Sequence, residues 1–321
     1  MFPIKLPKKH MRSHCKIFIS LKSTVLGVII AATLLNANFQ ANEAWATEPS
    51  KSKPSKFIRV IKDQNNQTKS LDIAIISYRV KTKSGKPATV DLVGTVHIGD
   101  RKYYQLLNEE FKTYDSVLYE LIAPSNHIRR LRQEKLSKRK EKRESNMVSI
   151  LQEALKGVLG LEFQLDEIDY TVDNFVHADM SPRQFERTME NRGESLLGMF
   201  LKILLQEKAL DSDEGALTQV KLVLALLNKD KPRALKSVLA DQIENIEKFT
   251  LMLDGDEGST IIGERNNVAL ARLRDSLNKN QQKIAIYYGA AHMPDLEEKL
   301  LKEFGAEEIS SRWLTAWDIA N

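Results

Sequence analysis

Residues 88–98, 101–114 and 115–122 constrain the fold of this chain more than any other feature. The first and third segments are apolar runs of strand character, and the second repeats apolar side chains along one helical face. A strand, a helix and a strand in close succession indicate a βαβ unit, because parallel neighbours need a long crossover connection. The sequence therefore predicts an α/β fold built on a mainly parallel sheet with flanking helices.

The sheet is expected to be mixed, because an antiparallel hairpin precedes this unit. Residues 73–80 and 88–98 both have strand character, and Gly85 and Pro87 mark a turn between them. Late in the chain we expect a helix, a buried strand, a helix ended by a glycine, and a last strand or strand pair: residues 263–277, 283–290, 294–304 before Gly305, and 308–319.

The middle of the chain, at about 127–253, shows little strand character. Long runs of Leu, Ala, Glu, Gln and Lys predict a helical insertion there, with residues 196–208 and 217–228 as its most apolar helices. We expect a polar linker at 47–70 and a single α/β domain over 71–321 that contains this insertion.

The first 46 residues have the pattern of a secretory signal peptide. Six basic side chains precede an apolar run at 24–35, and Ala44, Trp45 and Ala46 form a small-x-small cleavage signal. The run is shorter than the ~20 residues that span a bilayer. We therefore expect cleavage after Ala46 and a periplasmic or secreted protein. An uncleaved leader that anchors the protein to a membrane is the alternative.

The net charge argues against nucleic acid as a partner. The sequence has 48 Lys and Arg residues and 43 Asp and Glu residues. The first 46 residues hold six of the basic residues and one acid, so 42 of each sign remain after cleavage. Residues 129–143 carry nine basic and two acidic residues without interleaved aromatics, which is typical of a solvated helix. Contact of this segment with anionic lipid or nucleic acid is the alternative.

Four histidines remain after the leader, and two of them end matching G-x-x-H motifs. Gly94 begins the motif that ends at His97, and Gly289 begins the motif that ends at His292. Both motifs follow apolar strands and lead into helices. Ligands bind at the carboxyl ends of parallel strands, and a glycine there allows close approach. One strand-end histidine alone is more often a packed residue, but two such motifs together favour a functional site.

Two charged residues extend this set. Glu120 lies within an apolar strand at 115–122, where a buried carboxylate needs a cation, a proton or a metal as partner. An outward position on an edge strand is the alternative. Arg265 opens a late helix, from which its guanidinium can reach a carboxylate or an oxyanion. The only cysteine, Cys15, lies in the leader, so a metal would need His and carboxylate ligands.

Together these motifs resemble the TraB/GumN/Tiki family. The resemblance covers about 88–319 and rests on G-T-V-H-I-G at 94–99, L-Y-E at 118–120, E-R-N-N-V-A at 264–269 and G-A-A-H at 289–292. The family is distantly similar to erythromycin esterases and to haem-binding ChaN proteins. The segment that contains Asp179 also resembles a family segment. From the residues alone, Asp179 is first interpreted as an N-cap or turn residue before a helix at 182–191.

The resemblance implies a metal-assisted hydrolase that acts on peptides or proteins, since Tiki proteins resemble metal-dependent proteases. It implies that His97, His292 and Glu120 hold a divalent metal (Mn, Co or Zn) or act as general base, and that Arg265 stabilises an oxyanion. The residues expected to support the site are Gly94, Gly289, Asn266 and Asp179.

Two alternatives stay open. The chain has no H-E-x-x-H motif and no third histidine near the two motifs, so Glu120 and a histidine could activate water without a metal, as in erythromycin-esterase-like proteins. The other alternative is a cell-envelope protein that binds a peptide or haem without turnover. A haem needs a histidine or tyrosine in an open apolar pocket. Tyr103, Tyr104 and Tyr288 lie near the motifs, and core packing is the simpler interpretation for them.

Overall fold

The computed structural model describes residues 55–320 apart from 83–84, 125, 128, 131, 134–158, 196–211 and 245–258. The predicted signal peptide, the helix predicted at 196–208 and most of the basic segment at 129–143 lie outside these residues.

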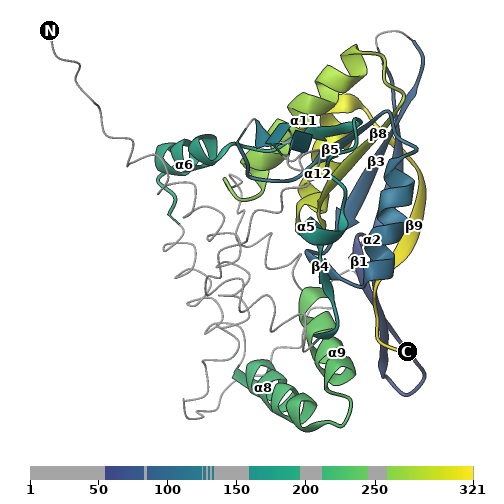
Figure 1. Ribbon diagram of the computed structural model, residues 1–321, viewed down its shortest axis with the longest axis vertical. Helices are drawn as coiled ribbons and strands as arrows, with labels where there is room; N and C mark the ends of the chain where they lie inside the picture. The colour runs from purple at the N-terminus through teal and green to yellow at the C-terminus, as the bar shows by residue number, and fades with distance from the viewer. Residues whose placement is uncertain are drawn as a thin grey trace, which may run out of the picture.

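One mixed, mostly parallel sheet forms the centre of an α/β fold, as the sequence predicts (Figure 1). Strand β2 (Thr68–Val80) pairs antiparallel with β3 (Ala88–Thr95), which confirms the predicted hairpin. The last strand, β9 (Glu307–Asp318), pairs antiparallel with β2 from Ser70 to Arg79. Strand β9 pairs along one edge of β2. The opposite edge of β2 is shared by β1 (Ile58–Lys62) and β3.

The prediction of a polar linker at 47–70 is wrong for its described part. Residues 58–62 form β1, which pairs with β2 from Ile73 back to Thr68. The strand was missed because only Ile58 is fully buried, Arg59 and Val60 are half-buried, and Ile61 and Lys62 are exposed. A short, half-exposed strand of this kind lacks the alternation that marks a strand in sequence.

The parallel half of the sheet runs β3–β8–β5–β7. The predicted strand–helix–strand unit is present as β3, α2 (Arg101–Phe111) and β5 (Ser116–Tyr119). However, β8 (Lys283–Gly289) lies between β3 and β5 and pairs in parallel with both. The strands that carry the two G-x-x-H motifs are therefore direct neighbours.

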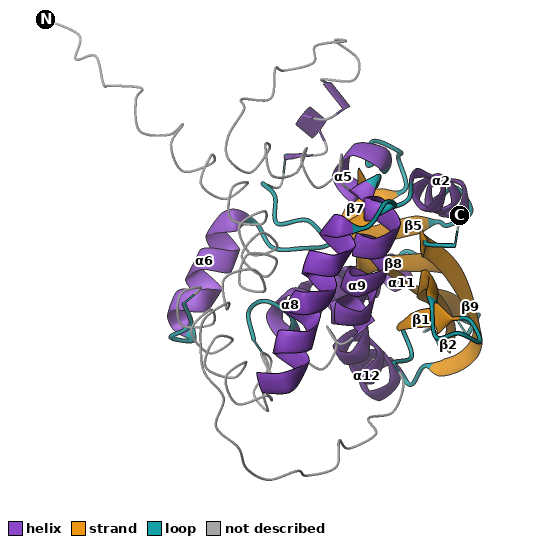
Figure 2. Ribbon diagram, turned by 90° about the horizontal axis from the view of Figure 1, so that it is seen from below, coloured by secondary structure: helices purple, strands orange, loops and turns teal. Residues whose placement is uncertain are grey.

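Helices cover both faces of the sheet (Figure 2). On one face α2 buries Tyr103, Tyr104, Leu107 and Phe111, and the Phe111 ring packs on Tyr287 of β8. The other face is covered by α11 (Gly263–Asn278) and by α12 (Met293–Phe304). As predicted, α12 ends at a glycine, Gly305, whose φ of 57° is left-handed.

The middle of the chain is less uniformly helical than predicted. Its described part contains α5 (Gln164–Glu167), α6 (Pro182–Asn191), α8 (Ser212–Leu227) and α9 (Lys231–Glu244). It also contains β7 (Phe175–His177), which extends the main sheet beside β5, and β6 (Glu162–Phe163), which pairs with β4 (Ile98–Gly99). The predicted helical insertion at about 127–253 is therefore wrong at 162–163 and 175–177, where strands of two or three residues are too short to show a period.

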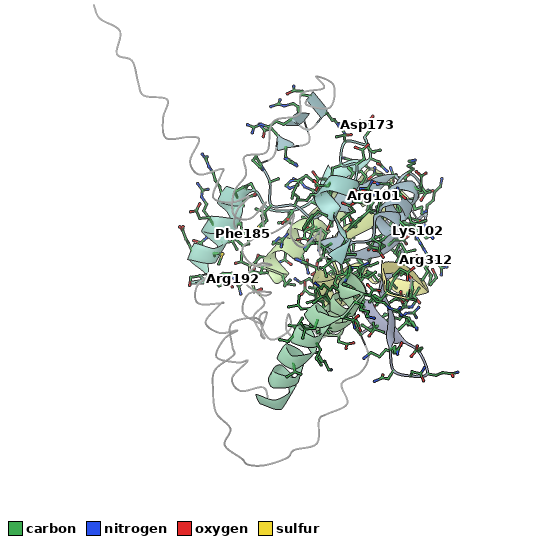
Figure 3. All side chains as sticks on the ribbon, turned by 60° about the horizontal axis from the view of Figure 1, so that its bottom comes forward. Arg101, Lys102, Asp173, Phe185, Arg192 and Arg312 are labelled. Carbon is green, nitrogen blue, oxygen red and sulfur yellow. The ribbon has the colours of Figure 1, made fainter. Side chains whose placement is uncertain are left out.

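Helix α6 lies apart from α2, as the labelled Phe185 and Arg192 on one side and Arg101 and Lys102 on the other show (Figure 3). Phe185 packs in a small second apolar cluster, and Arg192 donates to Glu264 of α11 at 3.3 Å. Within the described ranges, no helix has the length and apolarity needed to cross a membrane.

Candidate functional site

The two G-x-x-H motifs meet at the carboxyl ends of neighbouring parallel strands. Thr95 of β3 is in register with Gly289 of β8. His97 follows β3 by two residues, and His292 ends the short helix η1 (Ala290–His292) that follows β8. Because the chain leaves both strands at this edge, the two histidines converge, as the sequence predicts.

Gly289 lies where three side chains meet. A methyl group added to it would lie 3.2 Å from Glu120 Oε2, 3.6 Å from His97 Nε2 and 3.8 Å from His292 Cδ2. The backbone N–H of Gly289 also donates to Glu120 Oε2 at 2.8 Å. The space over Gly289 is therefore bounded by two imidazoles and one carboxylate. We call these three residues the Gly289 cluster.

His97 is exposed and is oriented by Gln164. Its Nδ1 lies 2.9 Å from Gln164 Oε1, and the Gln164 amide nitrogen donates to the Tyr170 hydroxyl at 2.9 Å. An amide oxygen only accepts, so Nδ1 of His97 is the donor in this contact, and in the neutral ring the lone pair lies on Nε2. Of the His97 ring atoms, Nε2 is the one that lies nearest to the space over Gly289.

His292 is buried and is oriented in the same way by Asn266. Its Nδ1 lies 2.7 Å from Asn266 Oδ1, and Asn266 Nδ2 donates to the Asp295 carboxylate at 2.7 Å. The Asp295 carboxylate fixes the amide orientation, so Nδ1 is again the protonated nitrogen. Burial, together with the charge of Arg265, lowers the pKa of His292 to about 4 against an opposing effect of Glu120. The imidazole is therefore neutral at ordinary pH.

Glu120 follows β5 directly and is buried, so the alternative of an outward position on an edge strand is wrong. Its Oε1 accepts from Arg265 Nη2, and its Oε2 accepts from Gly289 N. Strand β5 lies inside the sheet between β8 and β7, which explains why the carboxylate cannot reach solvent on an edge. The carboxylate has the cationic partner that burial requires.

Arg265 joins two carboxylates. Its Nε and Nη2 donate to Asp179 at 2.9 and 2.7 Å, and Nη2 also donates to Glu120. Nη1 lies 3.3 Å from the Ile261 carbonyl oxygen and 3.4 Å from His292 Nε2. Burial alone would lower the pKa of Arg265, but the two carboxylates outweigh burial and raise it. The guanidinium is a permanent charge inside the site.

Asp179 belongs to this network, and its interpretation as an N-cap is wrong. The N-cap of α6 is Ser181, which forms a capping box with Gln184. Asp179 is fully enclosed and binds Arg265 through both oxygens, while its Oδ1 also accepts from Met180 N. A short polar residue before a helix gives the same sequence signal in either role.

The two motif glycines differ in what surrounds them. A methyl group on Gly94 would lie 3.0 Å from Ile73 Cγ2 and 3.6 Å from Met293 Cγ, both in the core. Gly94 thus serves the packing of α12 on the sheet, whereas Gly289 faces the cluster.

The three tyrosines near the motifs are core residues. Tyr103 and Tyr104 donate to the carbonyl oxygens of Gly94 and Val96, and Tyr288 donates to that of Ala178. All three are buried, which disfavours haem ligation by these hydroxyls.

The ligand types around Gly289 suit a divalent metal, since imidazole nitrogen and carboxylate oxygen are ligands of Zn, Mn and Co sites. Metal-bound histidines also commonly donate their second N–H to an oxygen acceptor, as both imidazoles do here. Among the described residues, no three His, Cys, Asp or Glu side chains are already arranged around one metal position. The residue types of the Gly289 cluster are therefore suitable ligands for a divalent metal.

Sequence reasoning missed Gln164 and Tyr170. Gln164 opens α5 directly after β6 and also donates its backbone N–H to the His97 carbonyl oxygen at 3.0 Å. The β4–β6 ladder brings it there. A single glutamine far along the chain carries no motif, so only the pairing of two-residue strands reveals it.

Comparison with known proteins gives no match: neither a protein-family model nor a curated protein matches this sequence.

The low pKa of His292 predicts a specific pH dependence of stability. An unfolded histidine has a pKa of about 6.5, so the unfolded chain binds a proton between pH about 6.5 and about 4 that the folded protein does not bind. In metal-free protein, the free energy of unfolding of the wild type should fall relative to that of His292→Gln as pH drops through this window. Above pH about 6.5, the difference in free energy of unfolding between the two proteins should not change with pH.

Urea unfolding at a series of pH values measures this difference, and NMR titration of the His292 ring reports its pKa directly. A ring that protonates near pH 6.5 would contradict the buried, neutral imidazole.

Proposed function

We propose that the protein is an exported hydrolase that cleaves peptide bonds at the Gly289 cluster. The observation that carries the proposal is that His97 Nε2 borders the space over Gly289 while its Nδ1 is held by the Gln164 amide oxygen. Glu120 borders the same space. Groups that accept protons and surround one small space are what water activation requires. The resemblance to the TraB/GumN/Tiki family supports peptides as the substrate class.

His97 is the best candidate for general base. It is the exposed member of the cluster, and its Nε2 borders the space over Gly289, where it can take a proton from water. Glu120 accepts a hydrogen bond from the same water and thereby orients it. The water oxygen attacks the peptide carbonyl, the base passes the proton to the leaving nitrogen, and the C–N bond breaks to give a carboxylate and an amine.

Arg265 positions Glu120 in this proposal. An arginine has five N–H donors, and the acceptors around Arg265 are Asp179, Glu120, Ile261 and His292. These contacts occupy the guanidinium, so it is held toward the carboxylates. We therefore assign it to holding the site together in place of the expected role at an oxyanion.

A divalent metal is part of the proposal. His97 Nε2, Glu120 and His292 would hold it, and His292 would do so only after its Nε2 gives up the contact with Arg265 Nη1 at 3.4 Å. When bound, the metal would lower the pKa of a water ligand and polarise the substrate carbonyl. The orientation of both imidazoles by Gln164 and Asn266 serves a metal and a metal-free general base equally well.

Replacing the cluster residues should abolish hydrolysis without unfolding the protein. We expect His97→Ala and Glu120→Gln each to lower kcat by about 100- to 10,000-fold, which is the usual contribution of a general acid or base. Cleavage of fluorescently labelled casein measures the effect. His127→Ala is the matched control, because this histidine lies in the helical segment after β5 and is not one of the side chains that border Gly289. A wild type that cleaves nothing, or a His97→Ala variant with full activity, would refute the mechanism.

Chelation tests the proposed metal independently of the rest of the mechanism. Prolonged dialysis against EDTA should remove hydrolysis, and Mn²⁺, Co²⁺ or Zn²⁺ should restore it, while a His292→Ala variant should not recover. Metal analysis of the purified protein gives a second readout. Undiminished hydrolysis in EDTA would eliminate the metal and leave Glu120 and His97 as a metal-free pair.

A further inference from the structure

Helix α8 exposes a continuous apolar stripe. Val220, Val223, Leu224 and Leu227 are spaced at i, i+3, i+4 and i+7, which places them on one face of the helix. Their exposed fractions, with that of the neighbouring Leu226, are 55, 57, 61, 77 and 49%. Single exposed apolar residues are ordinary, but a stripe of this kind marks an interaction surface.

The stripe is not the face that attaches α8 to the protein. Leu222 and Ala225 lie on the opposite side of the helix and are buried in the main core with Leu235 and Ala240 of α9. Helix α9 in turn packs on β1 and β2, so α8 is the outer helix of a hairpin at one end of the molecule (Figure 1). A helix that is apolar on two opposite faces needs a second apolar environment.

The stripe ends in a basic tip. Lys221 flanks it, Lys229 follows with Asp230 in the exposed turn, and Lys231 opens α9. The two acids of α8 itself, Asp213 and Glu214, lie at the other end of the helix. Of the described residues, none forms an ion pair with these three lysines. Apolar side chains bordered by lysines are the pattern of a helix that lies in the headgroup region of an anionic bilayer.

A second copy of the chain is a poorer occupant than a bilayer. A standard protein interface takes about 20–30 residues a side, and the stripe supplies four, or five with Leu226. A bilayer needs no such area, because each inserted side chain gains its transfer free energy independently.

We propose that the stripe and tip of α8 form a docking surface for anionic lipid membranes. With 16 residues, α8 is shorter than the ~20 needed to span a bilayer, so it lies in the interface with Val223, Leu224 and Leu227 toward the acyl chains. This contact is independent of the leader and holds the protein at a membrane even after cleavage at Ala46. It does not rest on the proposed hydrolysis.

A polarity-sensitive dye at the tip of α8 tests the proposal in the full chain. Cys15 is the only cysteine, so Cys15→Ser with Asn228→Cys allows one dye next to the intact stripe. The matched control carries the dye at Lys302→Cys, an exposed position on α12. Both proteins are mixed with vesicles of phosphatidylcholine and phosphatidylglycerol, and with vesicles of phosphatidylcholine alone.

We expect a blue shift of the dye at residue 228, stronger with phosphatidylglycerol, and none at residue 302. Val223→Ser, Leu224→Ser and Leu227→Ser together should weaken vesicle partitioning about tenfold or more. Lys229→Glu and Lys231→Glu should each remove about fivefold of the preference for anionic vesicles.

Three results would overturn the proposal. The first is the absence of a shift at residue 228 with any vesicle. The second is an equal shift at residues 228 and 302, which indicates adsorption through another surface. The third is a shift at residue 228 that depends on protein concentration without vesicles, which indicates a second copy on the stripe.

Discussion

The site depends on one buried cation, the guanidinium of Arg265 between Asp179 and Glu120. A buried charge is tolerated only when it is paired and hydrogen-bonded. Here the pairing joins helix α11, the end of β5 and the segment after β7, which are far apart in the chain. Removing the arginine would leave two buried carboxylates uncompensated, a change that typically costs about 3–5 kcal/mol. The same contacts that hold these elements together also hold Glu120 beside Gly289, so the site is formed before any substrate arrives.

The elements with a clear period were predictable from the sequence. The strands at 73–80 and 283–290 are apolar along their length, and α12 has both an apolar face and Gly305 at its end. The strand β1 and the three-residue β7 were not predictable, because their pairing comes from neighbours and not from their own pattern. The insertion of β8 between β3 and β5 is likewise a property of the assembled sheet.

The residues of the site also divide into those that the sequence predicts and those that it does not. His97, His292 and Glu120 were predictable, since a polar residue at the end of an apolar strand is conspicuous. Gln164 and the bidentate role of Asp179 were not, because amides and short acids before helices have common structural roles. The resulting symmetry, in which each imidazole is held by an amide from another segment, appears only in three dimensions.

The most direct test of the account is the Gly289→Ala variant. Gly289 has φ of −51°, so alanine adds no backbone strain, and its methyl group would enter the space among Glu120, His97 and His292. The account predicts that casein cleavage falls at least about tenfold while urea stability is nearly unchanged. Gly94→Ala, the equivalent change in the other motif, should instead lower stability, because its methyl group meets Ile73 in the core. Full activity of Gly289→Ala would contradict a reaction in the space over Gly289.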